Sequence, residues 1–120
     1  MIKKIIEDYG EFSDSWISGI KLFENNNENV FELIIHCANK SKNYSYEKVK
    51  LLFTKVISYK VIGKNGVTDF APKEVFIKDE NGMITFDFFP IDHFDYIEEN
   101  PNSEFIIKCK ELRYEVLSIE

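Results

Sequence analysis

Apolar and polar residues alternate along much of this chain with the two-residue period of β-strands. The longest such stretch runs from Tyr46 to Ile62, where apolar residues occupy the odd positions from 49 to 61 except at Lys55. Its even positions mix lysine, serine and threonine with Leu52 and Val56. Because successive side chains of a strand point to opposite faces, this pattern predicts one face in a core and one largely in water.

An amphipathic helix is the competing interpretation of the same stretch. The helical spacing i, i+3, i+4, i+7, i+8 is also apolar, through Val49, Leu52, Phe53, Val56 and Ile57. Two features favour the strand: β-branched and aromatic residues are abundant, and the stretch runs into the turn-forming segment 63–66. We therefore predict extended structure over residues 46–62, as one strand or as two.

Alternation and turn signals predict the other strands, which lie at 14–23, 30–38, 74–77, 83–89 and 104–118. The polar loop 24–29 makes the first two a hairpin, and the Asn-Gly pair at 81–82 closes a second hairpin because both residues tolerate positive φ. Gly19 indicates a bulge. The apolar phase changes across residues 110–111, which predicts either a bulge in one long strand or a tight turn between two.

Helical spacing is confined to two short places. Residues 1–9 carry apolar side chains at helical spacing, which predicts a short helix or a packed arm, and one helical turn is expected near 94–98. No βαβ pattern is present, so the sheet should be antiparallel. We expect one mainly β domain over residues 1–120, an antiparallel β-sandwich or a curled meander of six to seven strands.

Composition adds a large aromatic core and limits the classes of partner. Eleven Phe, six Tyr and one Trp supply enough apolar surface for a cooperative fold without metals or disulfides. The net charge is −6 and Arg113 is the only arginine, which argues against nucleic-acid binding and phosphate clamps. No apolar run suits a membrane span, and none follows the N-terminal lysines, so we expect a cytoplasmic protein with reduced cysteines.

Few residues suit catalysis or metal binding. Cys37 and His36 are neighbours in a predicted strand, so their side chains point to opposite faces and cannot form a dyad. Cys37 is expected to be an inert buried thiol, with a pairing to His93 left open. Two histidines cannot supply a zinc cage, and the acids around Asp92 lack the alternation and the glycine of a calcium loop. We expect no enzyme activity, no metal and no cofactor.

Charge is distributed unevenly along the chain. Residues 40–64 carry seven lysines against one acid, whereas residues 79–104 carry eight acids, interleaved with aromatic rings, and no lysine or arginine. One interpretation is a solvated acidic rim over a core of rings. The other is a protein-binding surface, in which rings anchor a partner and carboxylates steer it. The residues predicted to contact a basic protein partner are Asp87, Asp92, Phe94, Asp95, Tyr96, Glu98 and Glu99.

Three stretches, 14–17, 46–53 and 110–116, together resemble the strand pattern of small β-rich bacterial proteins. Some proteins of that kind look like immunity proteins that accompany secreted toxins. The resemblance spans most of the chain through strand residues alone and carries no functional motif, so no site residue is transferred from it. It implies a cytoplasmic, non-enzymatic protein that binds and blocks a toxin, often through an acidic face.

Two other functions are compatible with the same pattern. A curled sheet lined with rings can enclose a small apolar ligand. Open strand edges can pair with one another, which would make the chain a homo-oligomeric structural module. The leading hypothesis is a protein-binding module whose contact is the acidic, aromatic segment.

Overall fold

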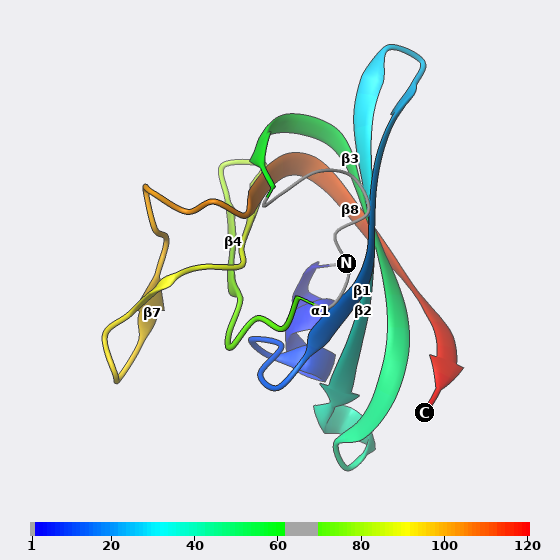
Figure 1. Cartoon of the computed structure of the whole chain (residues 1–120), viewed down its shortest axis with the longest axis vertical. Helices are drawn as coiled ribbons and strands as arrows, with labels where there is room; N and C mark the ends of the chain where they lie inside the picture. Colours follow the sequence, from blue (N-terminus) through cyan, green and yellow to red (C-terminus); the bar gives the residue numbers. More distant parts are fainter. Residues whose placement is uncertain (1, 62–69) are drawn as a thin grey trace.

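A six-stranded antiparallel sheet curls around a layer of aromatic side chains in this computed structural model, which describes residues 2–61 and 70–120 (Figure 1). Across the sheet the strands are β1 (Trp16–Asn25), β2 (Glu28–Asn39), β3 (Ser45–Lys60), β8 (Ile106–Ile119), β5 (Met83–Asp87) and β4 (Phe76–Glu80). A separate hairpin consists of β6 (Ile91–Asp92) and β7 (Ile97–Glu98). The predicted mainly β, antiparallel fold is confirmed, as a curled sheet rather than a sandwich.

The longest predicted strand is confirmed as β3, which pairs with β2 on one side and β8 on the other. Its core face changes at Lys55, whose φ is +52°. Phe53 before this point is fully buried, whereas Ile57 and Tyr59 beyond it are 51% and 43% exposed. The predicted odd-numbered core face is therefore wrong beyond Lys55. The turn predicted at 63–66 lies outside the described residues.

Strand β8 changes phase at the same level as β3. Thr54 pairs with Glu111 and Val56 pairs with Cys109, so the two strands change phase together, and the register then shifts between Val56 and Ser58. Of the two alternatives at 110–111, the structure contains one long strand. Beyond this point, the start of β8 pairs with β5, and the two long strands carry the sheet around toward β4 (Figure 1).

Both predicted hairpins are confirmed. The turn between β1 and β2 contains Asn26 and Asn27 at positive φ, and the β1–β2 register shifts between Ile17 and Gly19, where the sequence predicts a bulge. The turn between β4 and β5 is the Asn-Gly pair at 81–82, with φ of +54° and +74°. Both turns follow from residue types that enter the left-handed region at little cost.

Helix α1 (Ile2–Tyr9) lies in the hollow of the sheet (Figure 1), which confirms the short helix predicted there. Its apolar face packs into the core, with Ile5 and Tyr9 buried. Among the described residues, no helix has the length and apolar character that a membrane span requires. The helix is thus an internal packing element of a curled sheet.

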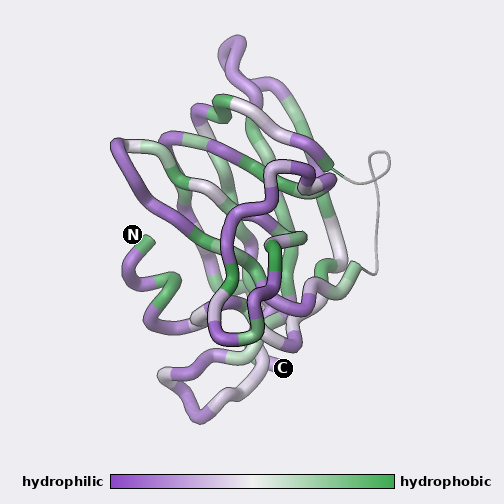
Figure 2. The backbone as a smooth tube through the Cα atoms, turned by 90° about the vertical axis from the view of Figure 1, so that its left-hand side faces the viewer, coloured by the Kyte–Doolittle hydropathy of each residue, from purple (hydrophilic) through white to green (hydrophobic). Residues whose placement is uncertain are grey.

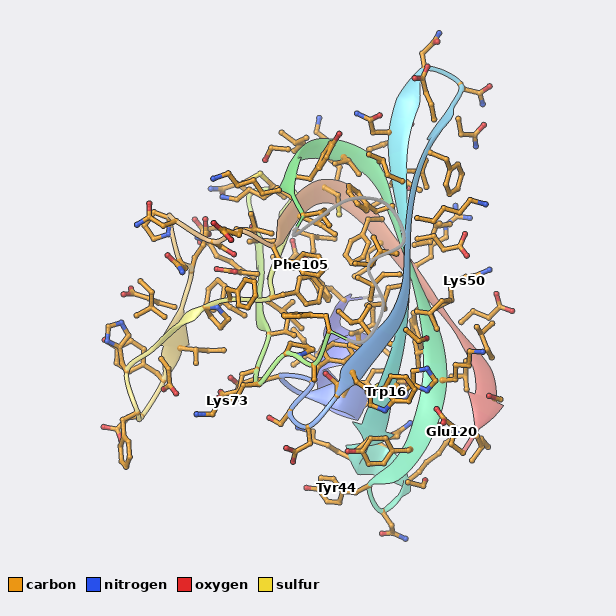
Figure 3. The ribbon with its side chains drawn as sticks, viewed as in Figure 1. Trp16, Tyr44, Lys50, Lys73, Phe105 and Glu120 are labelled. Atoms are coloured by element: carbon orange, nitrogen blue, oxygen red, sulfur yellow. The ribbon has the colours of Figure 1, made fainter. Side chains whose placement is uncertain are left out.

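Phenylalanine rings fill the space between the helix and the sheet. Six of them are almost completely buried: Phe12, Phe31, Phe53, Phe86, Phe88 and Phe105. Figure 3 shows Phe105 within the hollow, where its ring centroid lies 4.3 Å from that of Phe88. Because burying one such side chain contributes about 2 kcal/mol, these rings are a main source of stability.

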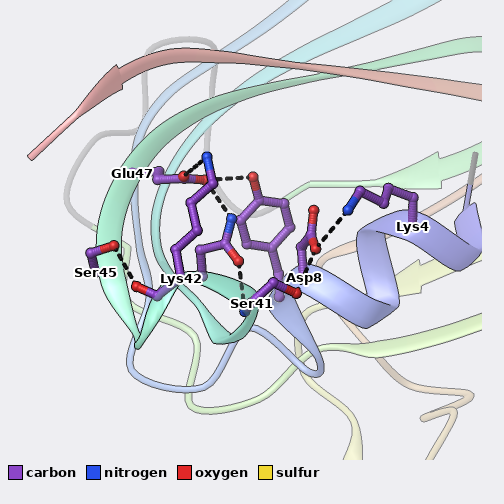
Figure 4. Close-up of polar contacts among 8 residues, drawn as sticks. Lys4, Asp8, Ser41, Lys42, Ser45 and Glu47 are labelled. Atoms are coloured by element: carbon purple, nitrogen blue, oxygen red, sulfur yellow. Dashed lines mark hydrogen bonds and ion pairs between the residues drawn. The ribbon is translucent and has the colours of Figure 1, made fainter.

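A buried carboxylate ties α1 to β3 (Figure 4). Glu47 is fully buried, and its Oε1 accepts hydrogen bonds from the Tyr9 hydroxyl at 2.7 Å and from Asn39 Nδ2 at 3.1 Å. Lys42 Nζ lies 3.5 Å from Oε2. The two hydrogen bonds to Oε1 and the nearby ammonium group reduce the cost of burying the charge, although Oε2 itself accepts no hydrogen bond. They also hold the end of α1, and with it the following segment 10–14, against the sheet.

Candidate protein-binding surface

The β6–β7 hairpin stands away from the curled sheet, on the left in Figure 1 and toward the viewer in Figure 2. Ile91 pairs with Glu98 and Asp92 pairs with Ile97, while His93 N–H donates to the Tyr96 carbonyl at 2.9 Å. The helical turn predicted at 94–98 is therefore wrong. Because extended pairing begins at 97, only four residues remain for the connection, and these form a tight turn.

Phe94 occupies the tip of this hairpin in an unusual state. Its side chain is 95% exposed and its φ is +78°. Asp92 Oδ1 accepts the Phe94 N–H at 2.8 Å, which is the local hydrogen bond of an Asx turn. A bulky residue at positive φ is a conformational outlier that its surroundings must impose, and such outliers are concentrated at functional sites.

Neighbouring side chains brace the tip. The rings of His93 and Tyr96 stack with their centroids 4.7 Å apart, and His93 Nε2 lies 2.6 Å from Glu98 Oε1. Tyr96 remains 61% exposed. The hydrogen bond from the Phe94 N–H, together with nearby Lys73, lowers the pKa of Asp92 below its ordinary value of 3.8. The hairpin therefore presents two aromatic rings on a turn held by several local contacts.

The acidic residues predicted as contacts divide into two groups. Asp92, Asp95 and Glu98 are exposed on the hairpin beside Phe94 and Tyr96, as an accessible contact requires. Glu99 is half-buried and pairs with Lys108 Nζ at 2.7 Å. Glu99 is therefore less accessible to a partner than the three exposed acids.

Asp87 is fully buried, so the prediction that it contacts a partner is wrong. Its Oδ1 accepts the Phe89 N–H at 3.0 Å and its Oδ2 accepts the Asn100 N–H at 2.7 Å. Asp87 thus ties the segment leaving β5 to the segment that follows β7. Its role is to fix the base of the hairpin.

A groove of about 790 Å³ opens beside the hairpin. It runs between the end of α1, the loop before β3, the start of β4 and β7. Its walls include four tyrosines and three carboxylates, contributed by Tyr9, Tyr44, Tyr46, Tyr96, Glu11, Asp14 and Asp95. A concave site of this volume is within the range of ordinary ligand pockets. The sequence prediction found only the part of this groove that lies in the acidic, aromatic segment.

Residues 11–14 and 44–46 are the part that sequence reasoning missed. The sequence places Asp14 and Tyr46 at the starts of predicted strands and the rest of both segments between predicted elements. Only the fold brings the two segments together: the Tyr46 hydroxyl donates to the Asp14 carbonyl at 2.7 Å. A weak local signal exists in Tyr44, an aromatic residue inside an otherwise polar loop. Tyr44 is 65% exposed and lies at the lower end of the sheet in Figure 3.

A second polar cluster lies on the face of the sheet opposite the core. His36 Nε2 is 2.9 Å from Ser18 Oγ, and His36 Nδ1 bonds the Glu120 carboxylate. The Trp16 indole stacks on the imidazole with ring centroids 3.6 Å apart. Figure 3 shows Trp16 and Glu120 near each other at this face. The hydroxyl, imidazole and carboxylate follow the order of a serine-hydrolase triad, but the imidazole is sealed beneath a ring on the outside of a sheet.

The thiols and the remaining acids form no second centre. Cys37 and Cys109 are free and buried, and burial raises the pKa of each to about 12. Thiolates are the reactive form of cysteine, so both thiols are inert at neutral pH. Within residues 2–61 and 70–120, no group of three or more His, Cys, Asp or Glu side chains is arranged to hold a metal ion.

Comparison with known proteins adds no family to this description. None of the protein-family models, curated proteins or solved structures compared with the chain matches it.

Proposed function

We propose that this chain is a non-enzymatic protein-binding module whose contact is the β6–β7 hairpin. The observation that carries the proposal is Phe94, a large apolar ring held almost entirely in water at positive φ. Exposing such a ring and straining its backbone both cost free energy in the isolated protein. A partner with a pocket for the ring would recover the first cost, and the braced turn lowers the entropy lost on binding.

The charge around the tip supports a basic partner. Asp92, Asp95 and Glu98 surround the two exposed rings, and the chain carries a net charge of −6. Carboxylates around an aromatic anchor accelerate encounter with a positively charged surface, and salt screens this effect over about 8 Å at physiological ionic strength. A basic bacterial toxin, blocked by this chain as an immunity protein, is one partner of that chemistry.

Two observations favour binding over catalysis or storage of an apolar ligand. A triad nucleophile needs an open substrate site and oxyanion donors, whereas the Ser18 and His36 pair lies under Trp16 on the outer face of the sheet. An enclosed apolar ligand needs interior space, and buried phenylalanine rings occupy the hollow of the sheet.

The test is capture of a partner from the native host by tagged variants. Phe94→Gly and Tyr96→Ser remove the two rings, and glycine adopts the positive φ of residue 94 without strain, so the fold should be kept. We expect the double variant to bind the captured partner about thirtyfold more weakly than wild type, the loss of about 2 kcal/mol typical of a hot spot.

Ile57→Thr is the matched control. Ile57 is an exposed apolar residue on β3, outside the hairpin, and threonine keeps its β-branched shape. The control should bind as wild type does. Equal binding by the hairpin variant and wild type, or the lack of any specific partner, would contradict the proposal.

A further inference from the structure

The groove beside the hairpin has walls of a particular chemistry. Tyr44, Tyr46 and Tyr96 bring accessible aromatic rings to it from two distant parts of the chain, and the buried Tyr9 also lines it. The electron-rich face of a tyrosine ring attracts a cation within about 6 Å, and the attraction grows when water is excluded. Several tyrosine rings around one concave site therefore favour a positively charged side chain over a neutral one.

The charges of the groove have the complementary sign. Glu11, Asp14 and Asp95 line it together with a single cation, Lys40. Burial, and after it the neighbouring Glu74 carboxylate, raise the pKa of Glu11, while Lys40 acts in the opposite direction. Three carboxylates against one ammonium group leave the lining with an excess of negative charge, which an incoming cation would reduce.

We infer that this groove receives a lysine or arginine side chain from an extended basic segment of the protein partner. The inference rests on the proposed function for the identity of the partner as a protein, and it adds a second contact with defined chemistry. Asp95 and Tyr96 belong to both the hairpin and the groove. A partner whose apolar pocket covers Phe94 would thus place neighbouring basic residues at the groove.

The test uses a short peptide, acetyl-Gly-Ser-Arg-Ser-Gly-amide, titrated into the full chain and followed by amide chemical shifts. The same peptide with citrulline in place of arginine has nearly the same shape without the charge. We expect the arginine peptide to shift amides of residues 10–14, 44–46 and 95–97. The citrulline peptide should bind about tenfold more weakly, the ratio expected for losing one effective charge contact.

The groove variant is Asp14→Asn with Asp95→Asn, which removes two charges at nearly constant shape. Asn is also suited to the positive φ of +58° at residue 14. Its matched control is Asp79→Asn with Glu80→Gln, two exposed acids at the β4–β5 turn. The groove variant should bind the arginine peptide about tenfold more weakly, and the control as wild type does.

The outcomes separate this inference from the proposed function. Equal binding of the two peptides, no effect of the groove variant, or no binding of the arginine peptide up to its solubility limit would overturn the groove inference. If the Phe94→Gly and Tyr96→Ser variant loses the captured partner while the groove variant keeps it at wild-type affinity, the function stands and the groove inference fails. If the arginine peptide binds as expected but no protein is captured, the cation-binding groove stands and the proposed function fails.

Discussion

At the scale of single residues, burial separates side chains that look alike in the sequence. Asp87 and Asp92 both belong to the acidic, aromatic segment of the sequence. Asp87 is fully buried and accepts hydrogen bonds from two backbone N–H groups, whereas Asp92 is exposed. Glu47 stands beside lysines, yet it is buried and bonded by Tyr9 and Asn39. Each of these two buried acids accepts hydrogen bonds that replace part of its lost hydration.

The buried thiols lead to a prediction about alkaline pH. Burial raises the pKa of Cys37 and Cys109 from the ordinary 9.0 to about 12 in the folded protein. The unfolded chain releases these protons near pH 9 and the folded chain keeps them, so their contribution to stability is complete below pH 9 and is lost as pH rises toward 12. Removing the thiols should therefore flatten the decline of stability above pH 9.

The measurement is urea unfolding of wild type and of Cys37→Ala with Cys109→Ala at several values of pH. We expect the variant to be less stable at pH 7, because two buried side chains are shortened. The difference in unfolding free energy should shrink between pH 9 and 11. A difference that stays constant over this range would show that the thiols ionise equally in both states.

At the scale of elements, single residues at positive φ determine where a strand bends and where a hairpin turns, which the apolar and polar pattern does not specify. Lys55 adopts a φ of +52° opposite the phase change of β8, so the two long strands bend together, and their register shifts just beyond it, between Val56 and Ser58. The same principle shapes the hairpin, where Asp92 accepts the Phe94 N–H across a four-residue turn. In each case one residue at positive φ redirects the chain, a choice that side-chain periodicity does not reveal.

Asp92 provides a prediction about the hairpin as an element. Asp92→Ala removes the acceptor of the Phe94 N–H, so the turn should lose order although both aromatic rings remain. The pKa of Asp92 lies below its ordinary value of 3.8 in the folded state, because the carboxylate accepts the Phe94 N–H. This hydrogen bond should be kept while Asp92 is ionised and lost as the pH falls through the lowered pKa.

Backbone order parameters measure this effect at residues 93–96. The variant at pH 7, and wild type at a pH below the lowered pKa of Asp92, should both have lower order there than wild type at pH 7. Asp95→Ala is the control, because its carboxylate is exposed on the same turn. Unchanged order in the Asp92 variant would contradict the bracing role.

At the scale of the whole molecule, stability should be unequal between the sheet and the hairpin. β3 and β8 are central strands with partners on both sides, and they pair with each other over most of their length. The β6–β7 pair joins two residues to two residues outside the main sheet. Binding surfaces are often drawn from such less stable parts of a fold.

Amide hydrogen exchange measures this difference. We expect the slowest exchange in β3 and β8 at residues 49–53 and 109–114, where exchange requires global unfolding. The hairpin, residues 91–98, should exchange by local opening and respond little to low concentrations of denaturant. Equal protection of the hairpin and the central strands would mean that they unfold as one cooperative unit.

The sequence by itself determined the elements whose signals are local. Alternation over 46–60 and the Asn-Gly turn at 81–82 specify strands and a hairpin, because side-chain direction and backbone φ depend on near neighbours. The sequence also indicated Phe94 and Tyr96 as candidate contacts, because both rings lie among acidic residues. These features need no knowledge of what lies across the molecule.

Only the tertiary structure decided the burial of Asp87, the reversal of core face at Lys55, and the groove that joins residues 11–14, 44–46 and 95–97. Each depends on which distant segments meet. The Tyr46 hydroxyl reaches the Asp14 carbonyl, for example, because α1 is fastened to β3 through Glu47. Long-range packing of this kind sets the environment of a side chain, and environment rather than residue type determines whether an acid is a structural anchor or a contact.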